Sequence, residues 1–391
     1  MKHIRLSDSH KVPQAFPAVR FLCFAACAAV FCSVAFIALS AKRPVQPDFP
    51  VSVTVPLIGE TTAAPPGDSA VASCLIDGKS GAVLYEKNSH TRLPMASTTK
   101  IMTALIVLEH LSLDTIVKTP AEATLVEGSS LYLRENEPMT VENLLFGLLL
   151  ESGNDAAHTL AVAVAGDIPS FAALMNDKAA ELGLCDTHFE NPHGLSADGH
   201  YTTAYELARI TAEAMKYPFF RQAVAAKTHA FTASDGTTRH FFNHNRLLSM
   251  VDGVVGVKTG FTKAAGRCLV SALQKGDARF IAVTLNDGDD WRDHRHLLSY
   301  AAQNFESIEI APPGAFGVYA YETHFSNPEG IYLTVPKGTH VTFSYQAALS
   351  ASGGSVAYFL SDGTPLGRFA LLPTAILPDK APFTACGRAA Y

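Results

Sequence analysis

The hydrophobic positions of the chain form one long N-terminal run and a series of shorter periodic segments. The run, residues 21–41, contains no charged side chain. About 20 such residues are enough to span a bilayer. Four basic residues precede the run and two follow it directly, which places residues 1–20 in the cytoplasm. The run is either a retained signal anchor or a signal peptide cut after Ala38-Leu39-Ser40, and both predict that the remainder is exported to the cell envelope.

Residues 42–66 are rich in Pro, Thr and Ala, which is typical of an extended linker. Beyond the linker, segments with strand periodicity and segments with helical periodicity follow one another. The pattern predicts a hairpin over 70–88, a buried helix from Ser97, and a helix from Thr140 with Thr140 as N-cap. Further helices are predicted over 156–166, 171–184 and 205–218.

Near residue 251 the period changes from helical to alternating. We expect strands over 251–258, 268–274 and 279–286, a turn over 259–266, and a last helix over 291–305. Helices beside an antiparallel meander define an α+β domain, predicted over 67–308. The remainder, 309–391, consists of short alternating segments and predicts a small separate all-β domain.

Composition narrows the class of protein. The 391 residues are 48% hydrophobic and 17% charged, as expected for a folded chain with a substantial core. The net charge of −6 argues against nucleic acid as a partner. Of the four cysteines beyond the N-terminal run, Cys74 and Cys268 lie in strand-like segments and are expected in the core. A disulfide among Cys74, Cys185, Cys268 and Cys386 stays open.

Ser97 and Lys100 are the first candidate for chemistry. Side chains three apart on a helix share one face, so the amine can reach the hydroxyl. The apolar residues that follow predict burial, which lowers the pKa of an amine and lets it act as a base. Alone, a Ser-x-x-Lys pattern is common in any sequence.

Two further motifs follow along the chain. Ser152-Gly153-Asn154 separates two predicted helices, and its ordinary interpretation is a helix stop followed by a cap. Lys258-Thr259-Gly260 combines a cation, a hydroxyl and a residue without a side chain, a set that suits a carboxylate ligand. Its ordinary interpretation is an exposed strand end with a tight turn.

The order of the three motifs changes their weight. Ser97, Ser152 and Lys258 are separated by 55 and 106 residues, and Ser-x-x-Lys, Ser-x-Asn and Lys-Thr-Gly in this order are typical of penicillin-binding proteins and class A β-lactamases. The chain resembles the D-alanyl-D-alanine carboxypeptidases of low molecular mass, serine peptidase family S11, over about residues 68–308. Supporting segments are LYEKNSHTRLPMASTTKIMTAL, TVENLLFGLLLESGNDAAHTLA, LGLCDTHFENPHGLSADGHYTT and VDGVVGVKTGFTKAAGRCLVSA.

The resemblance implies a penicillin-binding/β-lactamase-like transpeptidase fold and an acyl-enzyme mechanism on peptidoglycan stem peptides that end in D-Ala-D-Ala. It implies no metal and no organic cofactor, and covalent inhibition by β-lactams. The membrane is expected as a partner through the N-terminal segment. The implied roles are nucleophile for Ser97, general base for Lys100, proton relay for Ser152, positioning for Asn154, carboxylate binding for Lys258, Thr259 and Gly260, and an oxyanion hole from the backbone N–H groups of Ser97 and Phe261.

Four alternatives remain open. A D,D-endopeptidase would use the same residues on peptide cross-links. A class A-like β-lactamase would carry Asp where Gly153 stands and a water-activating glutamate that we do not find. A zinc peptidase could draw on His240 and His244 or on His294 and His296, although the chain has no His-Glu-x-x-His. A non-catalytic wall-binding protein would be expected to have lost Ser97, Lys100 or Asn154.

Overall fold

The computed structural model describes residues 63–233, 235–311, 317–320, 323–326, 330–350, 353–360, 363 and 365–374. The chain divides into two compact units, Met1–Pro50 and Val51–Tyr391, and all described residues belong to the second. The predicted membrane segment 21–41, most of the predicted linker and Cys386 lie outside the described residues.

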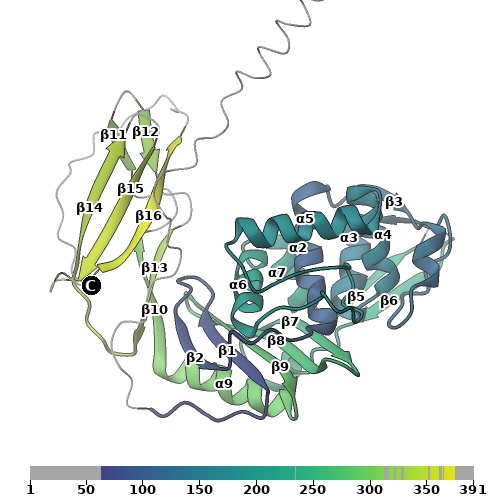
Figure 1. The fold of residues 1–391 in the computed structure, drawn as a ribbon, viewed down its shortest axis with the longest axis horizontal. Coiled ribbons are helices and arrows are strands. Elements are labelled where there is room, and N and C mark those ends of the chain that lie inside the picture. The colour runs from purple at the N-terminus through teal and green to yellow at the C-terminus, as the bar shows by residue number, and fades with distance from the viewer. Residues whose placement is uncertain are drawn as a thin grey trace, which may run out of the picture. The chain divides into compact units, whose positions relative to one another are not determined.

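A five-stranded antiparallel sheet forms the centre of the predicted α+β domain, in the order β2-β1-β9-β8-β7 (Figure 1). The hairpin predicted over 70–88 is confirmed as its first two strands, and the predicted meander supplies the other three. The strands are β1 Ala72–Asp77, β2 Val83–Lys87, β7 Val254–Thr262, β8 Gly266–Lys275 and β9 Ala278–Asp287.

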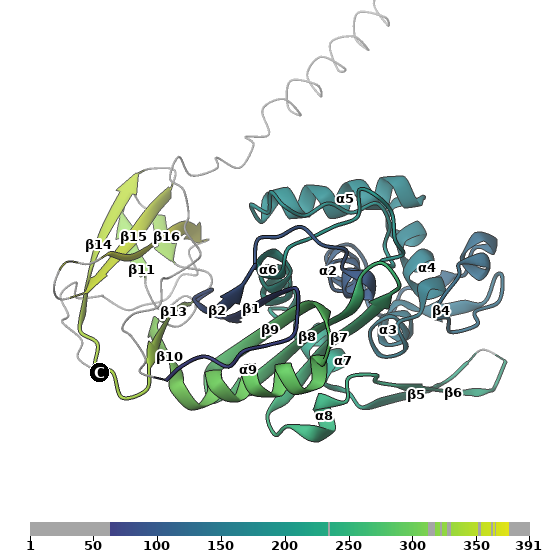
Figure 2. The same ribbon diagram turned by 60° about the horizontal axis from the view of Figure 1, so that its bottom comes forward.

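Alternating side chains of β8 and β9 serve two hydrophobic cores on opposite faces of this sheet. Leu269 and Phe280 pack with α9 (Asp290–Asn304), whereas Val270 and Ile281 join the larger core that contains α2 (Lys100–His110). Figure 2 shows α9 along one face, with the short helix α8 (Leu247–Met250) beside it, and the other long helices on the opposite side.

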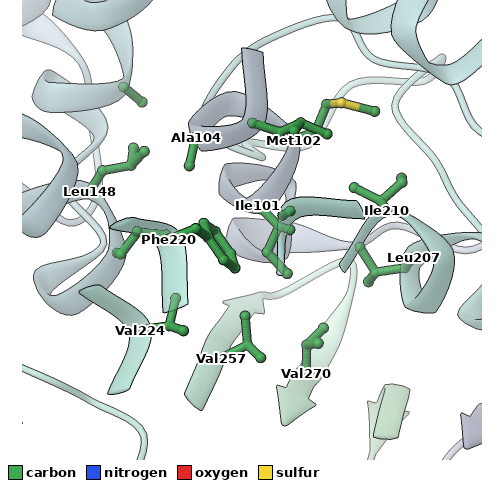
Figure 3. Close-up of a cluster of buried hydrophobic side chains, with 14 of the residues drawn as sticks. Ile101, Met102, Ala104, Leu148, Leu207, Ile210, Phe220, Val224, Val257 and Val270 are labelled. Atoms are coloured by element: carbon green, nitrogen blue, oxygen red, sulfur yellow. The ribbon is translucent and has the colours of Figure 1, made fainter. Parts of the chain in front are cut away.

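The predicted buried helix after Ser97 is confirmed. It begins with a 3-10 turn, η1 (Ala96–Thr99), and continues as α2, whose residues from Lys100 to Val107 are all buried. Figure 3 shows Ile101 of α2 close to Phe220, Val257 and Val270. Burying an aliphatic or aromatic side chain of this size contributes about 1.5–3 kcal/mol. Because α2 buries side chains on all of its sides, packing holds the helix in place from every direction.

The other predicted helices are also present, with shifted ends. Thr140 caps its helix as predicted, since its Oγ1 accepts a hydrogen bond from Asn143 N at 3.2 Å. The remaining helical elements are η2 Ala121–Leu125, α3 Val141–Phe146, the π-helical turn η3 Gly147–Glu151, α4 Asn154–Ala165, α5 Ile168–Glu181, α6 Ala204–Ala214, α7 Pro218–Ala225 and α8 Leu247–Met250.

Two sequence predictions in this part of the chain are corrected. The turn expected over 259–266 is wrong in its first half, because β7 continues to Thr262 and pairs with β8 through that residue. The polar and Gly-rich composition suggested a loop, but the ladder to β8 keeps these residues extended. Four strands were not predicted, the pairs β3 Ile116–Lys118 with β4 Pro138–Thr140 and β5 Thr228–Thr232 with β6 Thr238–Phe242.

The C-terminal region consists of strands, as predicted for a small β-domain. Its own core contains Leu333, Val356 and Tyr358. Gly317–Ala320 and Thr323–Ser326 are two strands that pair with each other in an antiparallel arrangement. The strands are β10 Phe305–Ala311, β11 Gly317–Ala320, β12 Thr323–Ser326, β13 Ile331–Pro336, β14 Phe343–Ser350, β15 Gly353–Leu360 and β16 Pro365–Thr374. The predicted domain boundary at 308 stays a prediction, and β10 runs across it.

Two further predictions concern cysteines and membrane spans. Cys74 and Cys268 are buried and free, as expected of core residues, and Cys185 is exposed and free. Among the described residues, no single helix is long and apolar enough to cross a membrane, and only α4 and α5 pass this test as a pair, bent by 83° at their junction.

Candidate active site

The turn η1 presents the Ser97 hydroxyl while it ties down its two hydroxyl neighbours. Thr98 Oγ1 donates to Met95 O at 2.6 Å, and Thr99 Oγ1 donates to Ala96 O at 2.8 Å. Ala96 itself adopts a left-handed backbone conformation, with φ of 47°. Such a conformation costs energy in a residue with a side chain and is typical of functional sites. Of three consecutive hydroxyls, only that of half-buried Ser97 is directed at Lys100.

Lys100 is fully buried and has three oxygen partners. Its Nζ lies 3.1 Å from Ser97 Oγ, 2.6 Å from Asn154 Oδ1 and 2.8 Å from His193 O. Burial, and next the charge of Lys258, hold the pKa of Lys100 well below its usual range, and Asp155 acts weakly in the opposite direction. A neutral amine has two hydrogens and one lone pair. It can donate to the Asn154 and His193 oxygens and accept the proton of Ser97.

Asn154 is oriented by the loop that precedes it in the chain. Its Nδ2 donates to Glu127 O at 2.6 Å, which leaves Oδ1 for Lys100. Gly128 has a φ of +93°, and a Cβ added there would lie 2.8 Å from Asn154 Nδ2. The glycine therefore gives the loop its bend and leaves room for the amide.

Ser152 ends η3 in a left-handed conformation, with φ of 64° and ψ of 31°. Asn154 then begins α4, so the helix-stop interpretation of this motif also holds. The Ser152 Oγ is buried and has no hydrogen-bond partner within the described part of the chain. An unpaired buried hydroxyl costs free energy, and it is available to a ligand in the site.

β7 brings the third motif to the same place. A Cβ added to Gly260 would lie 3.0 Å from Ser97 N and 3.1 Å from Thr98 N, so only glycine lets this strand approach the turn so closely. Thr259 is half-buried, and Phe261, the next residue along β7, is 66% exposed. The backbone of Phe261 is thus one residue along β7 from Gly260, where the strand lies against Ser97.

Lys258 is the second buried cation of the site. It is 1% exposed, and its Nζ donates to Thr259 O at 3.0 Å. Burial lowers the pKa of Lys258 to about 7, and the charge of Glu151 opposes this shift. Two buried amines therefore lie on two sides of the site, on α2 and on β7.

Two supporting residues were not predicted as site residues. Asp155 accepts hydrogen bonds from Leu131 N, Leu133 N and Ser130 Oγ, which fixes the loop next to Asn154. His200 Nδ1 accepts from Glu190 N, so its Nε2–H donates to Thr99 Oγ1 at 2.7 Å. Burial lowers the pKa of His200 to about 4, which keeps the ring neutral. Asp155 could have been predicted as a site residue because it directly follows the Ser-x-Asn motif. His200 lies 101 residues from Thr99, and no sequence pattern connects the two.

The histidines considered for zinc lie in separate settings. His294 is buried between Thr284 Oγ1 and Ser271 Oγ, at 3.0 and 2.9 Å. His244 Nε2 lies 3.2 Å from Glu151 Oε2, while His240 on β6 and His296 on α9 are exposed. His294 and His244 each have a protein partner that accounts for the position of the side chain.

Solved structures with this fold define the class of protein. The chain is similar to the DD-transpeptidase of Streptomyces K15, with a TM-score of 0.58 and 33% identity over 61% of this chain and 98% of that one. It is also similar to the D-alanyl-D-alanine carboxypeptidase DacD of Francisella tularensis, with a TM-score of 0.62 and 26% identity over 81% of this chain and 96% of that one. The fold is that of the penicillin-binding D,D-peptidases, as predicted.

The sequence comparisons identify the family. The profile of the D-alanyl-D-alanine carboxypeptidase family, peptidase S11, matches residues 59–289. The chain belongs to this family. It is 41% identical over 221 residues to the D-alanyl-D-alanine carboxypeptidase DacF of Bacillus subtilis, a match that covers 55% of this chain and 56% of that relative. The match therefore spans about half of the length of DacF.

Proposed function

We propose that this protein is a serine D-alanyl-D-alanine carboxypeptidase that removes the terminal D-alanine from peptidoglycan stem peptides. The observation that carries the proposal is the position of Lys100, a buried amine whose Nζ lies 3.1 Å from Ser97 Oγ and within 2.8 Å of two other oxygens that can accept its hydrogens. This is the arrangement that a general base needs in order to take the proton of a nucleophile.

In the first half of the proposed reaction, Ser97 Oγ attacks the carbonyl carbon of the penultimate D-alanine and Lys100 takes the hydroxyl proton. The N–H groups of Ser97 and Phe261 stabilise the oxyanion, since Gly260 holds β7 against the η1 turn. When the C–N bond breaks, Ser152 passes its proton to the leaving amine and takes one from Lys100, which becomes neutral again. Free D-alanine departs, and Ser97 carries the acyl group as an ester.

In the second half, water attacks this ester, with Lys100 again as base, and Ser97 is regenerated. Lys258 and Thr259 bind the terminal carboxylate of the substrate through charge and a directed hydrogen bond. A β-lactam presents a carboxylate and a strained amide to the same groups, so we expect it to acylate Ser97. The reaction requires no metal and no organic cofactor.

The proposal extends to the location of the enzyme. Its substrate lies outside the cytoplasm, and residues 21–41 have the length and polarity of a membrane anchor. We propose that this segment holds the enzyme at the outer face of the membrane, unless it is cleaved, in which case the enzyme is released into the envelope. The residues before 67 then act as the linker.

Substitution of Ser97 tests the proposal directly. Full-length Ser97→Ala should lose all covalent labelling by a fluorescent penicillin and all release of D-alanine from a stem pentapeptide, because no other hydroxyl replaces the nucleophile. Ser112→Ala, at an exposed serine after the far end of α2, is the matched control and should keep both. Labelling that persists in Ser97→Ala would refute the assignment. Comparing the pentapeptide with a cross-linked peptide dimer separates carboxypeptidase from endopeptidase activity.

A further inference from the structure

Glu151 lies at the end of η3, directly before Ser152, and the roles assigned above do not use it. Its Oε1 accepts a hydrogen bond from Phe242 N at 2.6 Å, and its Oε2 lies 3.2 Å from His244 Nε2. Both partners come from β6 or the residues after it. A single carboxylate thus ties the hairpin β5–β6 to the turn that presents Ser152.

The same carboxylate is placed to act on Lys258. β7, which carries Lys258, packs against η3, which carries Glu151. Lys258 has no carboxylate within hydrogen-bonding distance among the described residues, and its Nζ donates only to Thr259 O. Glu151 is the charge that favours its ammonium form, against the effect of burial.

Other charged groups near β7 are either fixed elsewhere or act in the opposite sense. Lys100, on the far side of the site, is buried, and its own pKa is lowered by the charge of Lys258. The cations on elements packed against β7 face their own partners: Arg267 pairs with Asp290, Lys275 donates to Ala302 O, Arg221 donates to the carbonyls of Met215 and Lys216, and Arg246 lies over the ring of Trp291. Glu151 is therefore the described anion with the most direct influence on Lys258.

We propose that Glu151 is a positioning residue that holds Ser152 and the end of β6 in place and keeps Lys258 charged for the carboxylate of the substrate. The proposal rests on the function proposed above and deepens it. It assigns the recognition of a C-terminal carboxylate to a pair of charges, Lys258 in contact with the ligand and Glu151 behind it. Without Glu151, the buried Lys258 would lose its proton, and with it its affinity for an anion, at a lower pH.

The test compares the acylation of Ser97 by benzylpenicillin and by its methyl ester across the pH range. The ester lacks the carboxylate, so the ratio of the two second-order rate constants reports the charge of Lys258, while effects on Ser97 and Lys100 cancel. In the wild type the ratio should fall as pH rises through about 7, where Lys258 loses its proton. Glu151→Gln keeps an acceptor for Phe242 N but has no charge, so its ratio should fall at lower pH.

We expect a loss of about three- to tenfold in this ratio at pH 7.5 for Glu151→Gln, because each unit of pKa corresponds to a factor of ten in the protonation equilibrium. Glu151→Asp, which keeps the charge, should recover part of it. His244→Gln removes one partner of the carboxylate but not the carboxylate, and should keep the wild-type profile. Glu213→Gln, which removes an equal charge from an ion pair with Lys216, is the matched control.

An identical ratio in Glu151→Gln and the wild type at every pH would overturn the inference. Failure of the proposed function would look different, since neither penicillin would then acylate the wild type. In that event the titration of Lys258 is followed by NMR on full-length protein with 15N-labelled lysine, with Lys258→Arg to assign the signal. A midpoint that is lower in Glu151→Gln supports the role of Glu151, and an unchanged midpoint refutes it.

Discussion

The four residues from Ser97 to Lys100 show how much a local sequence can determine. A three-residue spacing and an apolar continuation predict that Lys100 is buried next to Ser97, and both are observed. The prediction succeeds because the contact depends only on helix geometry and on the burial of one helix. It also follows from the sequence that the pKa of Lys100 is lowered, since burial is the main cause of that shift.

At the same scale, Gly260 is predicted to be indispensable for steric reasons. A methyl group there would meet the backbone nitrogens of Ser97 and Thr98, which cannot move without displacing the η1 turn. We expect Gly260→Ala to fold but to be acylated by penicillin about 10- to 100-fold more slowly, since a displacement of 1 Å can have such an effect. Gly67→Ala, where no atom lies within 4 Å of the added Cβ, is the control. A wild-type acylation rate in Gly260→Ala would contradict this account.

The groups that support the site could not be predicted in the same way. His200 contacts Thr99 across 101 residues, and Asn154 donates to Glu127 O across 27. Such contacts depend on how loops return to the site, and neither periodicity nor composition records that. The order of the three motifs indicated the partners of Ser97 only because the resemblance to a known family connects these motifs.

At the scale of elements, periodicity identified the sheet and the long helices but failed where polar residues form strands. β7 was predicted to end at Lys258 because Thr259, Gly260 and Thr262 have the composition of a turn. Their extended conformation comes from pairing with β8, a contact between segments. The hairpin β5–β6 was missed for the same reason, since only Phe241 of β6 is buried.

One junction between elements predicts an unusual dependence of stability on pH. Ser69 Oγ lies 2.8 Å from Asp287 Oδ1 and 2.6 Å from Asp293 Oδ2, at the corner where β9 meets α9. A hydroxyl has one hydrogen, so both contacts are hydrogen bonds only if one carboxyl is protonated. Asp293 also accepts from Ser69 N and Arg292 Nε, and its pKa is lowered by these bonds despite its burial. Burial raises the pKa of Asp287, so Asp287 is the more readily protonated of the two carboxyls.

Asp287→Asn tests this assignment. A carboxyl whose pKa is higher in the folded than in the unfolded state stabilises the fold fully below the unfolded-state value and loses that effect as pH rises through the folded-state value. Asparagine cannot lose a proton. The variant should therefore match the wild type near pH 4 and melt about 2–4 °C higher at pH 8, the shift that about 1 kcal/mol gives in a domain of this size. Thermal unfolding at several pH values measures it, with the exposed Asp277→Asn as control. A difference that does not change with pH would refute the shared proton.

At the scale of the whole molecule, the sequence predicted an α+β catalytic part followed by strands with a core of their own, and both are observed. The change from helical to alternating periodicity carries that information. How the second part joins the first could not be predicted. The connection includes polar contacts between residues more than 250 positions apart, and their side chains give no periodic signal.

Thr334 on β13 makes the clearest of these contacts. Its Oγ1 donates to Asp77 Oδ2 of β1 at 2.8 Å and lies 2.5 Å from Ser80 Oγ. All three side chains are buried, and burial raises the pKa of Asp77. Thr334→Val keeps the shape of the side chain but leaves the Asp77 carboxyl with one partner fewer. Loss of one partner from a buried polar group costs about 1–3 kcal/mol of unfolding free energy.

We therefore expect Thr334→Val to lower the unfolding free energy of the full-length protein by this amount, while penicillin acylates Ser97 at the wild-type rate well below the melting temperature. Chemical denaturation and labelling kinetics on the same samples measure the two quantities. The exposed Thr342→Val gives the effect of the same substitution without the buried contacts. Unchanged stability would mean that the buried contact adds nothing to the catalytic fold. A parallel loss of acylation would mean instead that the C-terminal strands support the active site directly, through β1 and the sheet that carries Lys258.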